Sequence, residues 1–220
     1  MVREGSALPF ADRAVAGERL GQWLAEAGIK PGLVVAIPRG GVPVAAPVAR
    51  RFKVPLSLAP VRKLGHPLEP ELAVGAVDAD GEVVWHPEWP WARRDMTAQV
   101  AEAVAAARAV AQRWAAYLPG PEAFAGDEVV VVDDGLATGL SLRAAVGWVV
   151  RRAQAAGLAP AVEAAVPVAA KAALAALARY GVRVFALETL DPLGAVGQAY
   201  RDFHPVTEAE MAAVLEALSR

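Results

Sequence analysis

Two adjacent carboxylates and a short loop of small and hydroxyl-bearing residues are the groups in this chain best suited to chemistry. Asp133 and Asp134 lead within a few residues into the loop Thr138-Gly139-Leu140-Ser141. The backbone N–H groups of such a loop, at the start of a helix, favour a phosphate. Like charges repel, so the acids must serve a neutral, hydroxyl-bearing or cationic part of the same ligand. The combination predicts a phosphorylated sugar.

The elements on either side of this segment explain how it is positioned. Val129 to Val132 is a β-branched apolar run, typical of a strand buried on both faces, and a helical pattern begins at about Ser141. A simpler interpretation is a buried strand that ends in an Asp-rich turn capping the next helix. Capping accounts for one Asp, but it does not account for two followed by Thr-Gly-x-Ser.

The whole segment, VVVVDDGLATGLS, resembles the phosphoribosyl-pyrophosphate (PRPP) motif of the type I phosphoribosyltransferases. In that family the acids hold the ribose hydroxyls and the loop wraps the 5′-phosphate. The resemblance implies that Asp133 and Asp134 take the ribose and act in catalysis. The substrate-binding residues that it implies after them are Gly135, Leu136, Ala137, Thr138, Gly139, Leu140 and Ser141.

A second candidate loop, Pro38-Arg39-Gly40-Gly41, follows the short apolar strand expected over 33–37. Arg39 supplies a fixed positive charge, and the glycines allow backbone amides to approach an anion. The loop resembles the pyrophosphate loop of the same family, which often carries a cis peptide at this place. We therefore expect Pro38, Gly40 and Gly41 to bind substrate and Arg39 to act in catalysis.

A third candidate, Arg62-Lys63, is expected at the end of a strand over 56–61. It resembles an Arg-Lys step of the adenine and orotate enzymes whose basic groups reach PRPP. Lys63 is therefore expected to be catalytic, with Arg62 binding substrate. The segment that follows, 64–91, is expected to form a lid loop and a hairpin, with three titratable groups that have solvated loop positions as the alternative: His66, Glu69 and Glu71.

The acceptor is expected to be recognised by a hood segment, residues 190–206. Tyr200 or Phe203 could stack there on a planar ring, although a packed tail would have the same composition. Ala137 stands where the 6-oxopurine enzymes of the family carry an Asp, which makes hypoxanthine and guanine poor candidates without establishing adenine. A tryptophan cluster near the hairpin is interpreted as hydrophobic cover: Trp85, Trp89 and Trp91.

Composition and periodicity set the class of protein. The chain has 220 residues, a formal net charge of -2 and no cysteine, which disfavours nucleic-acid binding, disulfides and a Cys-ligated zinc. No apolar run is long enough for a membrane span, and the N-terminus does not read as a signal peptide, so a cytoplasmic location is expected. Alternating strands and helices predict one α/β domain over 1–220, doubly wound around a mainly parallel sheet.

The resemblance to the type I phosphoribosyltransferases implies a pentosyltransferase of nucleotide metabolism. It would transfer the 5-phosphoribosyl group from PRPP to a nitrogenous acceptor and release pyrophosphate. Mg²⁺ is the expected ion, bound through the substrate, with Asp133 a possible ligand through water. The resemblance also suggests a homodimer. Two alternatives remain: a regulator that senses PRPP or a nucleotide without turnover, and a phosphosugar or nucleotide enzyme of another doubly wound fold with convergent acids.

Overall fold

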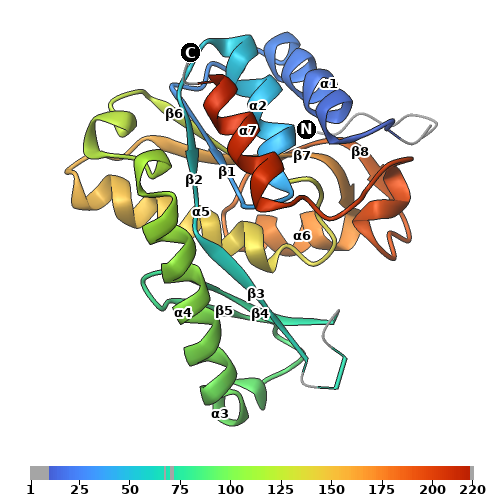
Figure 1. Cartoon of the computed structure of the whole chain (residues 1–220). Coiled ribbons are helices and arrows are strands. Elements are labelled where there is room, and N and C mark those ends of the chain that lie inside the picture. Colours follow the sequence, from blue (N-terminus) through green and yellow to red (C-terminus); the bar gives the residue numbers. More distant parts are fainter. Residues whose placement is uncertain (1–9, 67, 70–71, 219–220) are drawn as a thin grey trace.

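Five parallel strands form the main sheet, and their order places the candidate loops at one edge (Figure 1). The computed structural model describes residues 10–66, 68–69 and 72–218. The order is β2-β1-β6-β7-β8, so the strand sequence reverses direction between β1 and β6, where doubly wound sheets open a ligand crevice. The strands are β1 (Leu33–Ala36), β2 (Leu56–Leu58), β6 (Glu128–Val132), β7 (Ala161–Ala170) and β8 (Val184–Leu190).

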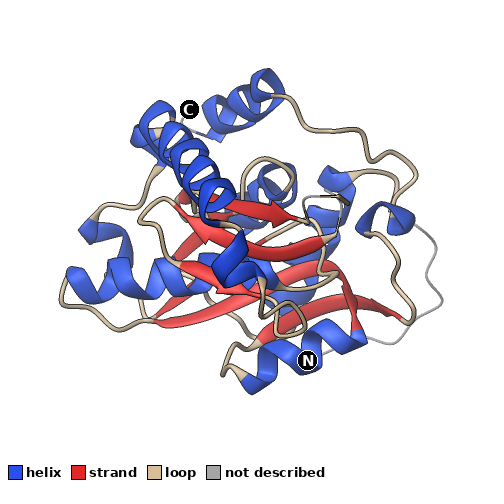
Figure 2. Ribbon diagram, turned by 90° about the horizontal axis from the view of Figure 1, so that it is seen from below, coloured by secondary structure: helices blue, strands red, loops and turns tan. Residues whose placement is uncertain are grey.

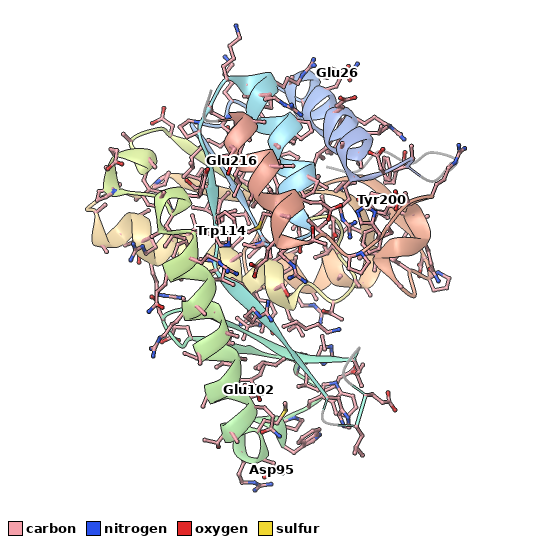
Figure 3. The ribbon with its side chains drawn as sticks, in the orientation of Figure 1. Glu26, Asp95, Glu102, Trp114, Tyr200 and Glu216 are labelled. Atoms are coloured by element: carbon pink, nitrogen blue, oxygen red, sulfur yellow. The ribbon has the colours of Figure 1, made fainter. Side chains whose placement is uncertain are left out.

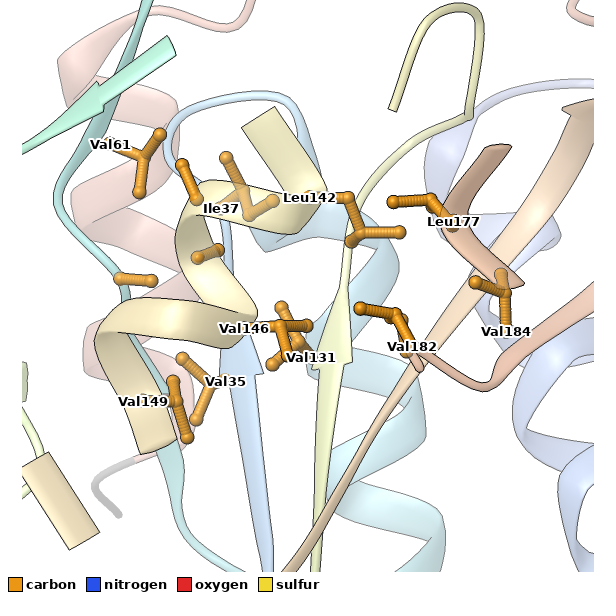
Figure 4. Packing of buried hydrophobic residues seen from close by; sticks show 14 of the residues in the cluster. Val35, Ile37, Val61, Val131, Leu142, Val146, Val149, Leu177, Val182 and Val184 are labelled. Carbon is orange, nitrogen blue, oxygen red and sulfur yellow. The ribbon is translucent and has the colours of Figure 1, made fainter. Parts of the chain in front are cut away.

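Helices cover both faces of this sheet, as Figure 2 shows, because its central strands are apolar on both sides. Val34 and Val130 face a core built with α1 (Arg13–Glu26), α2 (Gly41–Phe52) and α7 (Glu208–Leu218). Val35 and Val131 face the opposite core, built with α5 (Leu140–Ala155) and α6 (Lys171–Arg179) (Figure 4). The predicted α/β fold class is thereby confirmed. In the described part of the chain, no helix combines the length and apolar character that crossing a bilayer requires.

A smaller antiparallel sheet carries the predicted hairpin. Its order is β3 (Val61–Gly65), β4 (Ala73–Asp78), β5 (Val83–Trp85), and it contacts α5 and α4 (Thr97–Arg113). Every residue of β4 is buried, so this part of the expected lid is a packed layer of the fold. The three tryptophans pack on its small core, as expected of hydrophobic cover.

The prediction of one strand over 56–61 is wrong, because this segment contributes to two strands in two different sheets. β2 ends at Leu58, and β3 begins at Val61 beside β4. Pro60 lies between them, and because proline has no N–H, it cannot continue a hydrogen-bonded ladder. Arg62 and Lys63 therefore stand near the start of β3 and not at the end of a main-sheet strand.

The helical segment between the smaller sheet and β6 is interrupted. It is divided at Met96 into α3 (Ala92–Asp95) and α4. Short 3-10 turns follow it as η1 (Ala115–Tyr117) and η2 (Pro121–Phe124), and the hood segment contains η3 (Val196–Ala199). Thr207 and Glu210 form a capping box at the start of α7: the Glu210 N–H donates to Thr207 Oγ1 at 3.2 Å, and the Thr207 N–H donates to Glu210 Oε2 at 2.7 Å.

Candidate active site

The acid pair leaves the end of β6 and is held close to the sheet by backbone hydrogen bonds. The Asp134 N–H donates to Asp133 Oδ1 at 2.9 Å. Two residues further on, Leu136 bonds to β7 through both its N–H and its carbonyl, at 2.9 and 2.8 Å. Gly139 then starts α5 with a left-handed φ of +82°, which favours glycine. The local strand–loop–helix is therefore the one that the sequence predicts.

Arg13 is a site residue that sequence reasoning missed. Its Nε donates to Asp134 Oδ2 at 2.9 Å, its Nη1 donates to the His204 carbonyl at 2.9 Å, and its side chain is only 9% exposed. The Tyr200 hydroxyl donates to the backbone carbonyl of the same Asp134. Figure 3 labels Tyr200 among the side chains of the chain. The only local signal was a single Arg at the start of an amphipathic helix, which more often indicates a solvated charge.

Burial perturbs both acids. It raises the pKa of Asp133 well above its usual range, and the neighbouring Asp134 carboxylate adds to this rise. Burial also raises the pKa of Asp134, although the Arg13 guanidinium opposes that change by charge and by hydrogen bonding. A cation or a hydroxyl donor placed beside the pair would favour its ionised form.

The loop after β1 packs directly against these acids. A Cβ at Gly40 would lie 2.3 Å from Asp134 Oδ2, and one at Gly41 would lie 2.8 Å from the Val132 carbonyl. The two glycines are thus required by the close approach of the loop to the end of β6, in addition to any approach of an anion. The Pro38–Arg39 peptide bond is cis.

Two adjoining hollows meet at the acid pair. The first, of about 220 Å³, is lined by residues 135–141, named the phosphate loop after its predicted role, and by Val196 from the hood segment. The second, of about 300 Å³, is lined by the loop after β1 and by the start of β3. Four residues belong to both hollows, so one ligand could extend through the two: Lys63, Asp133, Asp134 and Ser141.

The structure thereby brings together all but one of the predicted site residues. The first hollow contains Gly135, Leu136, Ala137, Thr138, Gly139 and Leu140, and the second contains Pro38, Gly40 and Arg62. Gly41 packs beneath the second hollow, against Val132 and Asp133. Arg39 instead lines a third hollow, of about 30 Å³, with Trp114 and Met211. Arg62 borders both the second and the third hollow.

The aromatic rings of the hood segment pack against other side chains. Tyr200 is 7% exposed, and its ring lies 4.9 Å from that of Phe203, which in turn lies 3.7 Å below the Arg13 guanidinium. This geometry favours the packed-tail interpretation over a free stacking platform. Val196 is the hood residue that lines the first hollow, and a Cβ at Gly135 would lie 2.4 Å from its Cγ1.

Two titratable groups of the lid segment that the structure describes, His66 and Glu69, do not line the hollows that hold the acid pair. The His66 ring contacts the rings of Trp89 and Trp91 at centroid distances of 5.7 and 5.5 Å. Its Nδ1 accepts a hydrogen bond from the Leu68 N–H, and Glu69 is exposed. Glu71 lies outside the described residues, so its predicted role is not addressed by the structure.

The parallel sheet with helices on both faces, and a crevice at its switch point bordered by two acids and the start of α5, place the chain in the doubly wound α/β class. The model of the phosphoribosyl transferase domain matches residues 12–200. Two curated Mycobacterium tuberculosis proteins, from strains CDC 1551 and H37Rv, carry provisional names as phosphoribosyl transferases. Each is 37% identical to this chain over 215 residues. The chain belongs to the type I phosphoribosyltransferase family.

The lengths of the curated relatives and two solved structures add detail to this assignment. The match covers 96% of the chain but 47% of each curated relative, so the chain spans about half of their length. A protein of known structure from Thermus thermophilus is 36% identical with a TM-score of 0.74, covering 96% of this chain and 99% of that one. A Neisseria gonorrhoeae protein with bound ppGpp shares the fold at a TM-score of 0.51 and 15% identity, over 99% and 98% of the two chains.

Proposed function

We propose that this protein is a PRPP-dependent phosphoribosyltransferase that transfers the 5-phosphoribosyl group to a nitrogenous acceptor and releases pyrophosphate. The observation that carries the proposal is the partly buried pair Asp133–Asp134, shared by two adjoining hollows. One hollow contains the phosphate loop, and the other contains the cations Arg62 and Lys63. Together they match the two charged ends of PRPP and the hydroxyls between them.

Each part of the site has a role in this reaction. The loop from Ala137 to Ser141 anchors the 5′-phosphate, and this remote binding energy orients the ribose. Asp133 and Asp134 accept hydrogen bonds from the ribose hydroxyls and lie near the positive charge that develops at the anomeric carbon. Lys63 and Arg62, with Arg39 more distant, neutralise the departing pyrophosphate.

The bond changes are those of a substitution at the ribose. The bond between C1 and the pyrophosphate oxygen breaks, and its electron pair leaves on pyrophosphate. The acceptor nitrogen gives its lone pair to C1, and its proton passes to pyrophosphate or to water. No described residue lining the two hollows stands out as a general base, so the acceptor is proposed to react through a nitrogen that is already nucleophilic.

Mg²⁺ is the proposed ion, and the acid pair fits it. Carboxylate oxygens are hard donors, and Mg²⁺ keeps several waters while binding one or two carboxylates together with substrate phosphates. Asp133 would hold the ion through a water molecule. Among the described residues, no group of three or more His, Cys, Asp or Glu forms a protein-only metal site. When bound, the ion would neutralise charge on the pyrophosphate.

The test is an incubation of the protein with PRPP, Mg²⁺ and a panel of bases and amines, followed by measurement of pyrophosphate release. Release that depends on one acceptor, with the matching phosphoribosyl product seen by mass spectrometry, is the expected result. PRPP binding without turnover on any acceptor would favour the alternative function, a sensor of PRPP, over the enzyme. The absence of PRPP binding in folded protein would overturn the proposal altogether.

A further inference from the structure

The buried cation Arg13 connects three parts of the site that are remote in sequence. Its guanidinium bonds to the Asp134 carboxylate, 121 residues away, and to the carbonyl of His204, 191 residues away. Its flat face lies 3.7 Å from the ring centroid of Phe203. A planar guanidinium with several donors can serve these partners at the same time, which an ammonium group cannot.

This connection has a direct effect on Asp134. A buried carboxylate without a partner is strongly disfavoured, and Arg13 supplies the opposite charge at 2.9 Å. Arg13 occupies Oδ2, so the other carboxylate oxygen is left to accept from a ribose hydroxyl. The other titratable or charged groups around Asp134 are Asp133 and Tyr200, and across the second hollow Arg62 and Lys63.

The same connection holds the hood segment in place. The chain just before α1 runs beside the hood: the Phe10 N–H donates to the Ala199 carbonyl at 2.6 Å, and the Phe10 carbonyl accepts from the Arg201 N–H at 2.7 Å. The Asp202 N–H donates to the Ala11 carbonyl at 2.9 Å. The start of α1 and the hood therefore form one unit, and Arg13 links this unit to the acid pair.

We propose that Arg13 is a positioning residue for phosphoribosyl transfer, which holds Asp134 as an oriented carboxylate and ties the hood segment to it. The inference rests on the proposed function, because the ribose is the ligand toward which Asp134 is oriented. It assigns different parts to the two acids. Asp134 is the acid fixed by the protein, and Asp133 is the one free to respond to the ligand and its ion.

The experiment is a double-mutant cycle on the affinity for Mg·PRPP, measured at one fixed pH in the full chain and in R13M, R13K, D134N and R13M/D134N. In R13M the Asp134 carboxylate loses the donor that orients its Oδ2, so the affinity should fall by about 10- to 100-fold. R13K keeps a charged donor and should restore part of this loss. In the D134N background R13M should cost less than about threefold, because the oriented acid is already absent.

Two results would overturn the inference. The first is a folded R13M protein that binds Mg·PRPP as tightly as the unmodified protein does. The second is a loss of the same size when R13M is made in the D134N background, because Arg13 would then act through another group. If R13M does not fold, R13Q gives the same comparison, since it removes the charge and keeps a donor for the His204 carbonyl.

A ligand-free measurement separates this inference from the proposed function. Urea unfolding of the same proteins without ligand should show the same pattern: R13M lowers the unfolding midpoint, and it does so much less in the D134N background. Additive changes would overturn the pairing of Arg13 with Asp134 whatever the substrate is. If the pairing is found but the unmodified protein binds no PRPP, the ion pair stands while both the proposed function and the role of Arg13 in it are wrong.

Discussion

The two ends of the candidate site are built in opposite ways. At the ribose end, Asp133 and Asp134 are perturbed by burial and are held by the backbone, by Arg13 and by Tyr200. At the pyrophosphate end, Arg62 and Lys63 are exposed side chains on a strand of the smaller sheet. One end is organised before any ligand arrives, and the other supplies charge from surface positions.

This difference indicates how binding energy is distributed. Exposed charges interact weakly until a ligand removes water from them, and ordering their long side chains costs entropy at that moment. Buried, oriented acids need no such ordering, but their charge must be compensated. Removing the acids should therefore do more damage to the reaction than removing any one cation.

The largest effect is expected for the double variant D133N/D134N. Asparagine keeps the shape of the pair but removes the charge that faces the developing cation, so PRPP-dependent pyrophosphate release should fall by about 10³ or more. D95N, at an exposed acid paired with Arg94, is the matched control and should keep full activity. Undiminished turnover by the double variant, with thermal unfolding like that of the original, would exclude the role given to the pair.

The next effect concerns the cations of the pyrophosphate end. K63A removes a residue shared by both large hollows, and the loss of one charge-assisted bond should lower kcat/KM by about 10- to 100-fold. R39A affects a residue of the third hollow and should lower it by less than about fivefold. Steady-state kinetics with varied PRPP gives both values. Equal losses in the two variants would show that Arg39 reaches pyrophosphate as well.

A smaller effect is expected where the loop after β1 meets the acid pair. G40A would place a methyl group 2.3 Å from Asp134 Oδ2, so the loop or the acid must move, at a cost of about 1–3 kcal/mol in unfolding free energy. G147A, inside α5 with only the end of the Arg151 side chain nearby, should instead stabilise by about 0.5–1 kcal/mol. Urea unfolding measures both, and a neutral G40A would mean that this contact is loose.

The smallest effect is a pH dependence of stability at the hood. Hydrogen bonds to Asp202 and Glu210 raise the pKa of His204 above its ordinary value of 6.5. Because the folded-state pKa is the higher one, this stabilisation is complete below pH 6.5 and is lost as pH rises through the raised value. Urea unfolding across this range should show the loss in the unmodified protein and not in H204Q. Identical pH profiles would show that His204 does not contribute to the pH dependence of the stability.

Much of this protein was determined by the sequence on its own, because the relevant signals are local. Apolar strands alternating with helical patterns specify a doubly wound sheet, and Thr207 with Glu210 specifies a helix start. The segment from Val129 to Ser141 carries its strand, acids and phosphate loop in one continuous stretch. Its backbone conformation depends mainly on neighbouring residues, so its identity could be inferred before any fold was known.

The tertiary structure alone decided which distant side chains meet. Arg13 and Asp134 are 121 residues apart, and nothing near Arg13 in the sequence distinguishes it from a solvated helix charge. The need for glycine at Gly40 arises from the approach of a second strand end, and Arg39 lines a hollow to which residues of α4 and α7 also contribute. Such contacts depend on how whole elements pack, whereas backbone conformation and the hydrophobic period depend on the residues within each element.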